Sequence, residues 1–403
     1  MQPSLGLELG PFGPGTLAEP LYLDACAAAP LAEPVVAAMV GAYQGSWANP
    51  SSLHGFGFAA ADSLERSRQT IAAALGCPAN WLTLCSGGTE ASHGALLGAA
   101  SQLPKGRLVI SAVEHPAVQA AARQLEAQGW ELAIWPVDGV GRVDLAWLDR
   151  LLAPPTRLMS VIWGQSEVGT LQPIETIGAA CRRAGVLFHS DGVQVLGHQP
   201  LAIEALPVDL LTFTAHKIQG PRGIGALVAR PDLALGTWIG GGGQEAGRRG
   251  GTEAVALAAG FAAAIQLAQA RLKAGGGRDP LEPERDRLLA ALETLPGVTI
   301  TGCRQRRLPH HLSLVLTSPS GQPLPGRQAV AGLWQRGLAV SSGTACASGR
   351  ASGSPVLQAM GFPPELAGSG LRLSLGPWLT PEQLQSLPDR VKAALLAVQA
   401  DLG

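Results

Sequence analysis

Between residues 80 and 230, short apolar runs alternate with longer amphipathic stretches. The apolar runs predict strands at 81–85, 108–112, 131–136, 158–163, 186–189, 210–214 and 225–229. A helical period separates several of them, at 116–128, 145–152 and 174–184. This alternation predicts an α/β fold in which helices cover both faces of a mostly parallel seven-stranded sheet. Ligands of such folds bind beyond the carboxyl ends of the strands, where this chain places several polar motifs.

The pattern changes near residue 272. Residues 272–284, LKAGGGRDPLEPE, read as a flexible hinge or a surface loop. The later segments predict, in order, a helix at 284–295, strands at 298–302 and 312–317, a helix at 327–336, a strand at 371–375 and a final helix. Thr380, Pro381 and Gln383 mark the start of that last helix, because they match a capping box with proline at the first helical position.

We therefore predict two domains. The large domain, residues 22–270, contains the parallel sheet, and the small α+β domain combines residues 1–21 with 271–403. The first twenty residues are rich in glycine and proline, and we expect them to pack against the small domain.

The balance of charges excludes some classes of partner. The 29 Lys and Arg and the 30 Asp and Glu leave a net charge of −1, without the basic excess that nucleic-acid binding uses. Apolar residues make up 46% of the chain and charged ones 15%, which is enough for a large core. The longest apolar run, 254–265, is shorter than the roughly 20 residues that span a bilayer. We expect neither nucleic acid nor membrane as a partner.

The cysteines and the N-terminal region bear on the compartment. The six cysteines form no CxxC pair, which argues against a structural metal site or a disulfide framework and for a reducing compartment. Taken singly, each cysteine is most simply a small buried apolar residue. No Lys or Arg precedes Arg66, so we expect no secretory or transit peptide and a cytoplasmic protein.

Two motifs at predicted strand ends suggest a phosphate and a reactive amine. SGGTE (86–90) follows a strand and opens a helix, where free N–H groups and the helix dipole favour an anion. Such turns are common, so this signal is weak alone. Lys217, in the segment TFTAHK, is one of only four lysines and ends another strand. It can be a surface lysine in an ion pair, or it can form the Schiff base of pyridoxal phosphate.

Two further strand ends carry an acid and a histidine. Asp191 can be a turn residue, or it can pair with a protonated pyridine nitrogen and keep the ring electron-withdrawing. His115 can be a structural histidine, or its ring can stack on an aromatic cofactor. Four such strand ends together favour a site for pyridoxal phosphate.

These motifs resemble those of a known family. The chain is similar to the fold type I pyridoxal-phosphate enzymes of the class V aminotransferase group, and within it to the cysteine desulfurases of the NifS/IscS type. The resemblance implies an α/β PLP-dependent transferase fold of type I. The matching segments are NPSS (49–52) with His54, SGGTE (86–90), EHPAV (114–118), Asp191 with Gln194, HKIQGPRGIG (216–225), GGGQEAGRRGGT (241–252), SSGTAC (341–346) and LRLSLG (371–376).

The resemblance implies roles for individual residues. For pyridoxal 5'-phosphate it implies a Schiff base on Lys217, a pyridinium partner in Asp191, contacts to the ring oxygen from Gln194 and Ser166, and a stacked ring in His115. It implies phosphate ligands in Gly88, Thr89, Thr214 and His216, and in Thr252 from a neighbouring subunit, hence a homodimer. It implies substrate contacts from Asn49 and Arg372, the latter a planar donor suited to a carboxylate. No metal ligand is implied.

The resemblance also implies a reaction. L-cysteine is converted to L-alanine with catalysis by Lys217, His115 and Cys346, and Cys346 carries the sulfur as a persulfide. The small residues around Cys346 suit a mobile loop that collects and delivers sulfur. The sulfur acceptor implied is a second protein, an iron–sulfur scaffold or a thiolation enzyme.

Two departures from the family pattern leave alternatives open. Ser166 stands where the family usually has asparagine, and Gln244 where it usually has histidine. They motivate a cysteine or cystine C–S lyase, which gives pyruvate and ammonia on the same fold. A non-catalytic sulfur-relay protein is a further alternative, against which Lys217, Asp191 and Thr89 argue.

Overall fold

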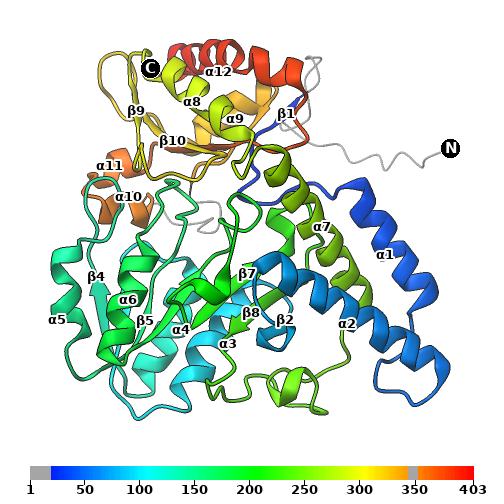
Figure 1. Cartoon of the computed structure of the whole chain (residues 1–403). Helices are drawn as coiled ribbons and strands as arrows, with labels where there is room; N and C mark the ends of the chain where they lie inside the picture. Colours follow the sequence, from blue (N-terminus) through cyan, green and yellow to red (C-terminus); the bar gives the residue numbers. More distant parts are fainter. Residues whose placement is uncertain (1–19, 344–352) are drawn as a thin grey trace. The chain divides into compact units, whose positions relative to one another are not determined.

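The computed structural model describes residues 20–343 and 353–403 of the chain (Figure 1). The chain forms two compact units. The larger comprises residues 28–280 with 302–309, and the smaller comprises the described parts of 1–27, 281–301 and 310–403. The predicted N-terminal packing falls on residues 1–19, which lie outside the described residues.

A seven-stranded sheet forms the centre of the larger unit. Its strands lie in the order β2, β8, β7, β6, β5, β3, β4. They span β2 (Leu82–Cys85), β3 (Arg107–Ser111), β4 (Glu131–Trp135), β5 (Thr156–Ser160), β6 (Leu187–Asp191), β7 (Leu210–Thr214) and β8 (Gly225–Ala229). Neighbouring strands are parallel except for β8, which is antiparallel to β7 and β2. The predicted mostly parallel seven-stranded sheet is confirmed.

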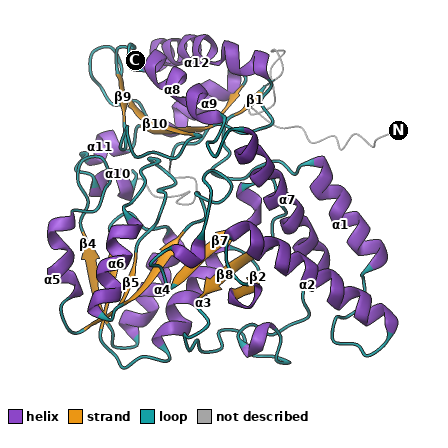
Figure 2. Ribbon diagram, viewed as in Figure 1, coloured by secondary structure: helices purple, strands orange, loops and turns teal. Residues whose placement is uncertain are grey.

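Helices flank the strands along the sheet (Figure 2). The helices of this unit are α1 (Glu33–Gly45), α2 (Gly55–Leu75), α3 (Gly88–Ala100), α4 (Pro116–Ala127), α5 (Leu148–Leu152), α6 (Ile174–Ala184) and α7 (Val255–Ala274). Short 3-10 turns are η2 (Ala79–Trp81), η3 (Leu145–Trp147), η4 (Ile203–Ala205), η5 (Ala215–Lys217) and η6 (Glu245–Gly247). Together they place an apolar layer on each face of the sheet.

The two faces bury different residues of the same strands. Leu211 and Phe213 of β7 join the core that includes residues of α2, α6 and α7, whereas Leu210 joins the core of α3 and α4. Side chains alternate between faces along a strand, so Thr212 and Thr214 lie on the α3–α4 face. Phe188 of β6 packs in the core of α2, α6 and α7. Asp191, three residues later on the same strand, therefore lies on the opposite, α3–α4 face. The polar strand ends therefore share one face.

Helix α7 is the most apolar long helix in the described part of the chain. By length and composition alone it could cross a membrane, but 56% of its apolar window is buried inside the structure. It packs against α1 and α2 within the larger unit. Its hydrophobicity is therefore that of a core helix.

The smaller unit contains two short sheets. Antiparallel β12 (Gly370–Ser374), β10 (His311–Leu316) and β9 (Val298–Ile300) form one, and parallel β1 (Leu21–Tyr22) and β11 (Leu338–Ala339) form the other. Its helices are α8 (Leu281–Leu292), α9 (Gly326–Gln335), α10 (Pro355–Ala359), α11 (Pro364–Ala367) and α12 (Pro381–Leu402). The capping box predicted for the last helix is present, since Thr380 and Gln383 bond each other's backbone N–H.

Several predicted boundaries differ from the structure; for example, the helix predicted at 284–295 is α8, Leu281–Leu292. β5 ends at Ser160 rather than 163, because the next residues pair with β6 backbone atoms outside the regular ladder. Trp81 belongs to η2 rather than to a strand. The predicted flexible segment 272–284 is shorter, since α7 continues to Ala274 and α8 starts at Leu281.

The connection that remains between α7 and α8 is held by side chains. Asp279 is buried and accepts from His198 Nδ1 at 2.6 Å and from Arg271 at 3.4 Å. Both partners belong to the larger unit. These two contacts tie the end of the glycine-rich segment to the larger unit. The domain boundaries at 22, 270 and 271 remain a prediction, and the compact units have other bounds.

Candidate functional site

The turn before α3 is built for close backbone approach. Gly87 has φ +151°, which side chains disfavour. A Cβ on Gly225 of β8 would lie 2.6 Å from the carbonyl oxygen of Phe213 and 2.7 Å from the Cα of Gly87. The glycines therefore let the turn lie directly on the strands. The first N–H groups of α3, from Gly88 and Thr89 onward, point out of its N-terminus, where an anion is favoured.

The charge of this turn is balanced by a neighbouring arginine. The Glu90 carboxylate accepts from the backbone N–H of Ser86 at 2.7 Å and from Arg249 at 3.0 Å. Burial would raise the pKa of Glu90, but these hydrogen bonds outweigh it and lower the pKa. The acidic side chain is thus paired with a positive charge beside the helix N-terminus.

Three residues of the phosphate and lysine motif lie at the end of β7 and in the turn that follows it. Thr214 Oγ1 lies 3.0 Å from His216 Nδ1, and Lys217 closes the 3-10 turn η5. Burial, and then the positive charges of Lys217 and Arg222, lower the pKa of His216 to about 4. His216 is therefore a neutral imidazole near pH 7, able to donate one hydrogen bond.

Asp191 is the last residue of β6 and is 5% exposed. Its Oδ1 accepts the backbone N–H of Val193 at 3.0 Å. Burial raises the pKa of Asp191, while the positive charge of Lys217, and that of His115 when its ring is protonated, oppose that rise. His115, Asp191 and Lys217 come from three different strand ends, and the fold brings His115 and Lys217 within electrostatic reach of Asp191.

His115 caps the helix α4. Its Nδ1 accepts the backbone N–H of Ala117 at 3.2 Å, which leaves the proton of the neutral ring on Nε2. Gln194 is buried in the turn after β6, on the segment that begins with Asp191. Both predicted cofactor residues therefore belong to the same strand-end edge as Lys217.

Ser166 lies in the loop after β5, which is organised by its neighbour Gln165. The side-chain oxygen of Gln165 accepts backbone N–H groups from Glu167 and Val168, and its amide donates to Val113 at 3.3 Å. The loop of Ser166 is thereby fastened to the loop that precedes His115. Sequence reasoning missed Gln165, although an amide directly before Ser166 was visible in the motif.

Asn49 and Thr252 lie together at a second place in the larger unit. A cavity of about 420 Å³ is lined by both, with Tyr43, Trp47 and Leu257 among the other residues. Its lining, as the structure describes it, contains none of the strand-end residues above. The fold therefore gathers the predicted site residues of this unit into two groups.

The segment 241–252 is held by a buried ion pair that sequence reasoning also missed. Glu245, with φ +49°, accepts two hydrogen bonds from Arg68, at 2.8 and 2.6 Å, and one from the backbone of Leu84 at 2.9 Å. Gln244, at the position of the family's usual histidine, accepts the N–H of Gly251 at 3.1 Å. It therefore closes the loop on which Thr252 lies.

Of the last two predicted residues, only Arg372 lies in the described part of the smaller unit. Arg372 lies on β12 and donates to Asp24 at 2.8 Å, with its side chain 4% exposed. Cys346 lies outside the described residues. The chain before it is anchored, because Ser341 and Arg372 exchange two backbone hydrogen bonds, and the chain after it begins α10 with the Ser354 cap.

The strand-end group fits pyridoxal phosphate in its chemistry. It offers a glycine-lined helix N-terminus with hydroxyls of Thr89 and Thr214 for a phosphate, and a buried carboxylate, Asp191, for a pyridinium. Lys217 supplies the amine within electrostatic reach of that carboxylate.

Known proteins are similar to this chain over most of its length. The family Aminotransferase class-V matches residues 21–387. The chain is similar to a Cysteine desulfurase IscS of Methylococcus capsulatus, 37% identical over 370 residues, 91% of this chain and 90% of that protein. It is 36% identical to another of Dictyoglomus turgidum, over 90% of this chain and 91% of that protein.

Solved structures agree in fold over nearly the whole chain. A NifS-like protein superposes with a TM-score of 0.83 at 29% identity, covering 95% of this chain and 99% of that one. A NifS-like protein from Rickettsia africae superposes with a TM-score of 0.80 at 29% identity, over 93% and 99% of the two chains.

Proposed function

The chain belongs to the class V aminotransferase family and, within it, to the pyridoxal-phosphate-dependent cysteine desulfurases, and we propose that it converts L-cysteine to L-alanine and passes the sulfur to Cys346. The observation that carries this proposal is the meeting of His115, Asp191 and Lys217 at three strand ends beside the N-terminus of α3. The predicted fold and cofactor agree with this membership.

Bound pyridoxal phosphate withdraws electrons from the substrate, so that bonds at its Cα and Cβ become easier to break. Asp191 is the residue that would hold the pyridinium. The positive charge of the pyridinium would favour the ionised form of Asp191, against the effect of burial. Gln194 and Ser166 would hold the ring oxygen. The α3 N-terminus, with Thr89, Thr214 and His216, would hold the phosphate.

Proton movement falls to two groups of this chain. Lys217 would take the Cα proton of the substrate through its side-chain amine. His115 presents an Nε2–H, because its Nδ1 accepts a backbone N–H, and Nε2 is therefore the atom that would donate a proton. Arg372 and Asn49 would bind the substrate, and Arg372 would hold the substrate's carboxylate.

Cys346 completes the reaction. Its thiolate forms a bond to the substrate sulfur while the carbon–sulfur bond breaks, which leaves a persulfide on the protein and alanine as product. The persulfide then passes to an acceptor protein, an iron–sulfur scaffold or a thiolation enzyme. The five described cysteines are free thiols, which suits the reducing cytoplasm as the place of this chemistry.

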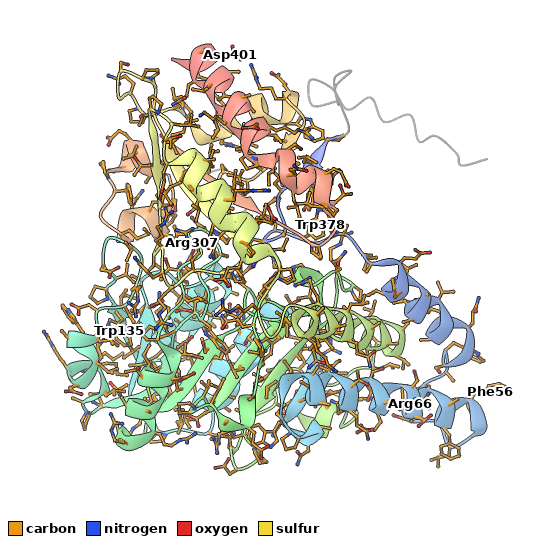
Figure 3. All side chains as sticks on the ribbon, turned by 45° about the horizontal axis from the view of Figure 1, so that its top comes forward. Phe56, Arg66, Trp135, Arg307, Trp378 and Asp401 are labelled. Atoms are coloured by element: carbon orange, nitrogen blue, oxygen red, sulfur yellow. The ribbon has the colours of Figure 1, made fainter. Side chains whose placement is uncertain are left out.

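A homodimer is part of the proposal. Large apolar side chains are exposed around α1 and the start of α2: Tyr43, Trp47, Leu53, Phe56 and Phe58. Figure 3 shows Phe56 at the outer end of α2. Thr252 lies beside this group, at the cavity that also includes Tyr43 and Trp47. A second subunit on this surface would cover the apolar side chains and receive Thr252 at its phosphate site.

One incubation tests the function. The protein loaded with pyridoxal phosphate receives L-cysteine and dithiothreitol, and alanine, pyruvate and sulfide are quantified together. We expect alanine and sulfide in equal amounts, and loss of both in Cys346→Ser, with Cys303→Ser as the control. Pyruvate in place of alanine would assign the chain to the C–S lyases instead.

A further inference from the structure

The loop between β3 and α4 contains a buried carboxyl group that the proposed mechanism does not use. Glu114, directly before His115, is 1% exposed. Its Oε1 accepts from the hydroxyl of Ser111 at 2.5 Å and from the backbone N–H of Ile162 at 2.7 Å. Its Oε2 is buried and has no hydrogen-bond partner among the described residues. A buried carboxyl group with one unsatisfied oxygen calls for an explanation.

The contacts of Glu114 join two strand ends of the site. Ile162 follows β5, and the next residue, Trp163, donates its backbone N–H to the carbonyl of Asp191 at 2.9 Å. The Glu114 side chain therefore fastens the loop of His115 to the same backbone that holds the end of β6. A change at Glu114 would shift His115 relative to Asp191.

The charge of Glu114 is constrained by its surroundings. Asp191 of β6 faces it as a second buried carboxylate, and two such groups cannot both be ionised at low cost. The basic groups of the site, His115 from the β3–α4 loop and Lys217 from η5, act on Asp191. The pKa of Glu114 is raised to about 8, chiefly by burial and further by the charge of Asp191. The hydrogen bonds from Ser111 and Ile162 oppose that rise.

We propose that Glu114 is a positioning residue of the cofactor site that acts as a neutral carboxylic acid: it holds the loop of His115 in place and leaves the negative charge of the site to Asp191. This inference rests on the proposed function, because the pyridinium of the bound cofactor is what requires a single anion at Asp191. The neutral group also avoids the cost of an ionised carboxylate with a bare buried oxygen.

Two substitutions separate the hydrogen bonds of Glu114, which we call the clamp, from the charge of its carboxyl group. Glu114→Gln keeps the oxygen that accepts from Ser111 and Ile162 and is neutral at every pH, whereas Glu114→Ala removes the clamp. Glu126→Gln makes the same charge change at an exposed position of α4 and is the control. We expect the dissociation constant of pyridoxal phosphate to change by less than about twofold in Glu114→Gln. In Glu114→Ala it should rise about tenfold, as expected for the loss of one or two net hydrogen bonds.

Infrared spectroscopy of the cofactor-free protein detects whether the Glu114 carboxyl group is protonated. Wild-type protein should show the carbonyl band of a protonated carboxylic acid at neutral pH, and the band should disappear as the pH rises through about 8. The band should be missing in Glu114→Gln and present in Glu126→Gln. A purely structural role for an ionised Glu114 would give no such band.

The outcomes are distinct. Equal weakening of cofactor binding in Glu114→Gln and Glu114→Ala, or no change in either, overturns the proposal, as does the absence of the infrared band. If Glu114→Ala does not fold, cofactor binding by Glu114→Gln and the infrared band still test whether Glu114 is a neutral positioning residue. Failure of the wild-type protein to bind pyridoxal phosphate would reject the proposed function, while the infrared band would still report the charge of Glu114.

Discussion

Arg68 of α2 holds the carboxylate of Glu245 with two hydrogen bonds, at 2.8 and 2.6 Å, although the two residues lie far apart in the sequence. Their side chains are only 14% and 3% exposed. The pair fixes the loop of Thr252 in a backbone conformation, φ +49° at Glu245 and φ +57° at Ala246, that such residues rarely adopt. A buried ion pair thus supports a strained loop that the proposed dimer uses.

The first prediction follows from this pair. Glu245→Gln should lower the free energy of unfolding by about 3 kcal/mol, because it removes the buried counter-charge of Arg68 and leaves only the more exposed Glu65. Denaturant unfolding measures the change. The control is Glu65→Gln, which removes the other, half-exposed partner of Arg68 and should cost less than about 1 kcal/mol. Equal losses in the two variants would mean that the buried pair does not stabilise the loop.

The second prediction concerns the amine of the site. Lys217→Ala should abolish the covalent link to the cofactor, so that borohydride reduction adds no cofactor mass to the protein. Alanine formation should fall by about 10²- to 10⁴-fold, the usual loss for a missing general acid–base group. Lys273→Ala, a substitution of an exposed lysine of α7, is the control and should behave as wild type. Cofactor mass retained on Lys217→Ala would place the link at another residue.

The third prediction concerns the substrate carboxylate. Arg372→Lys should raise KM for L-cysteine about tenfold or more, since an ammonium group cannot replace the two-point hydrogen bonding of a guanidinium. The dissociation constant of pyridoxal phosphate should stay unchanged, because Arg372 belongs to the smaller unit and the cofactor residues to the larger. Steady-state kinetics and cofactor titration measure the two quantities. An unchanged KM would remove Arg372 from the substrate site.

The fourth prediction is a pH dependence of stability. His189 lies between the hydroxyls of Ser160 at 2.8 Å and Thr212 at 2.9 Å, and burial lowers its pKa to about 3. The unfolded chain therefore binds a proton at His189 below about pH 6.5 that the folded chain does not bind until about pH 3. Stability should fall as pH drops through this window.

His189→Asn removes that titration. Its melting temperature should fall less steeply than that of wild type between about pH 6.5 and 4, although it starts lower at neutral pH because a hydrogen-bonded ring is lost. Thermal unfolding at a series of pH values gives the difference between the two proteins. Parallel curves would show that His189 contributes nothing to acid unfolding.

Local signals in the sequence located the strand ends well. The apolar runs at 210–214 and 225–229 coincide with β7 and β8, and the motifs that contain Lys217, Asp191 and His115 each follow or end a strand. Periodicity, glycine turns and capping residues act within a few neighbouring residues, so they are readable in one dimension. The resemblance to family motifs then supplied the expected roles of these residues.

The contacts made by Glu114, Glu245 and His189 had no such local signal. Each depends on which strands are neighbours, and the order of the sheet, with β5 between β6 and β3, is a property of the folded chain. The reversed direction of β8 was likewise not visible in its apolar run.

The sequence by itself therefore determined the strands, the helices and the cofactor motifs of this protein, because these follow from short-range pattern and chemistry. Only the tertiary structure decided that Asp191 meets His115 and Lys217, that Glu114 bonds to Ile162 and that Arg68 pairs with Glu245. The physical reason is that burial and long-range pairing set the charges and hydrogen bonds of a site, and both arise only when distant segments pack together.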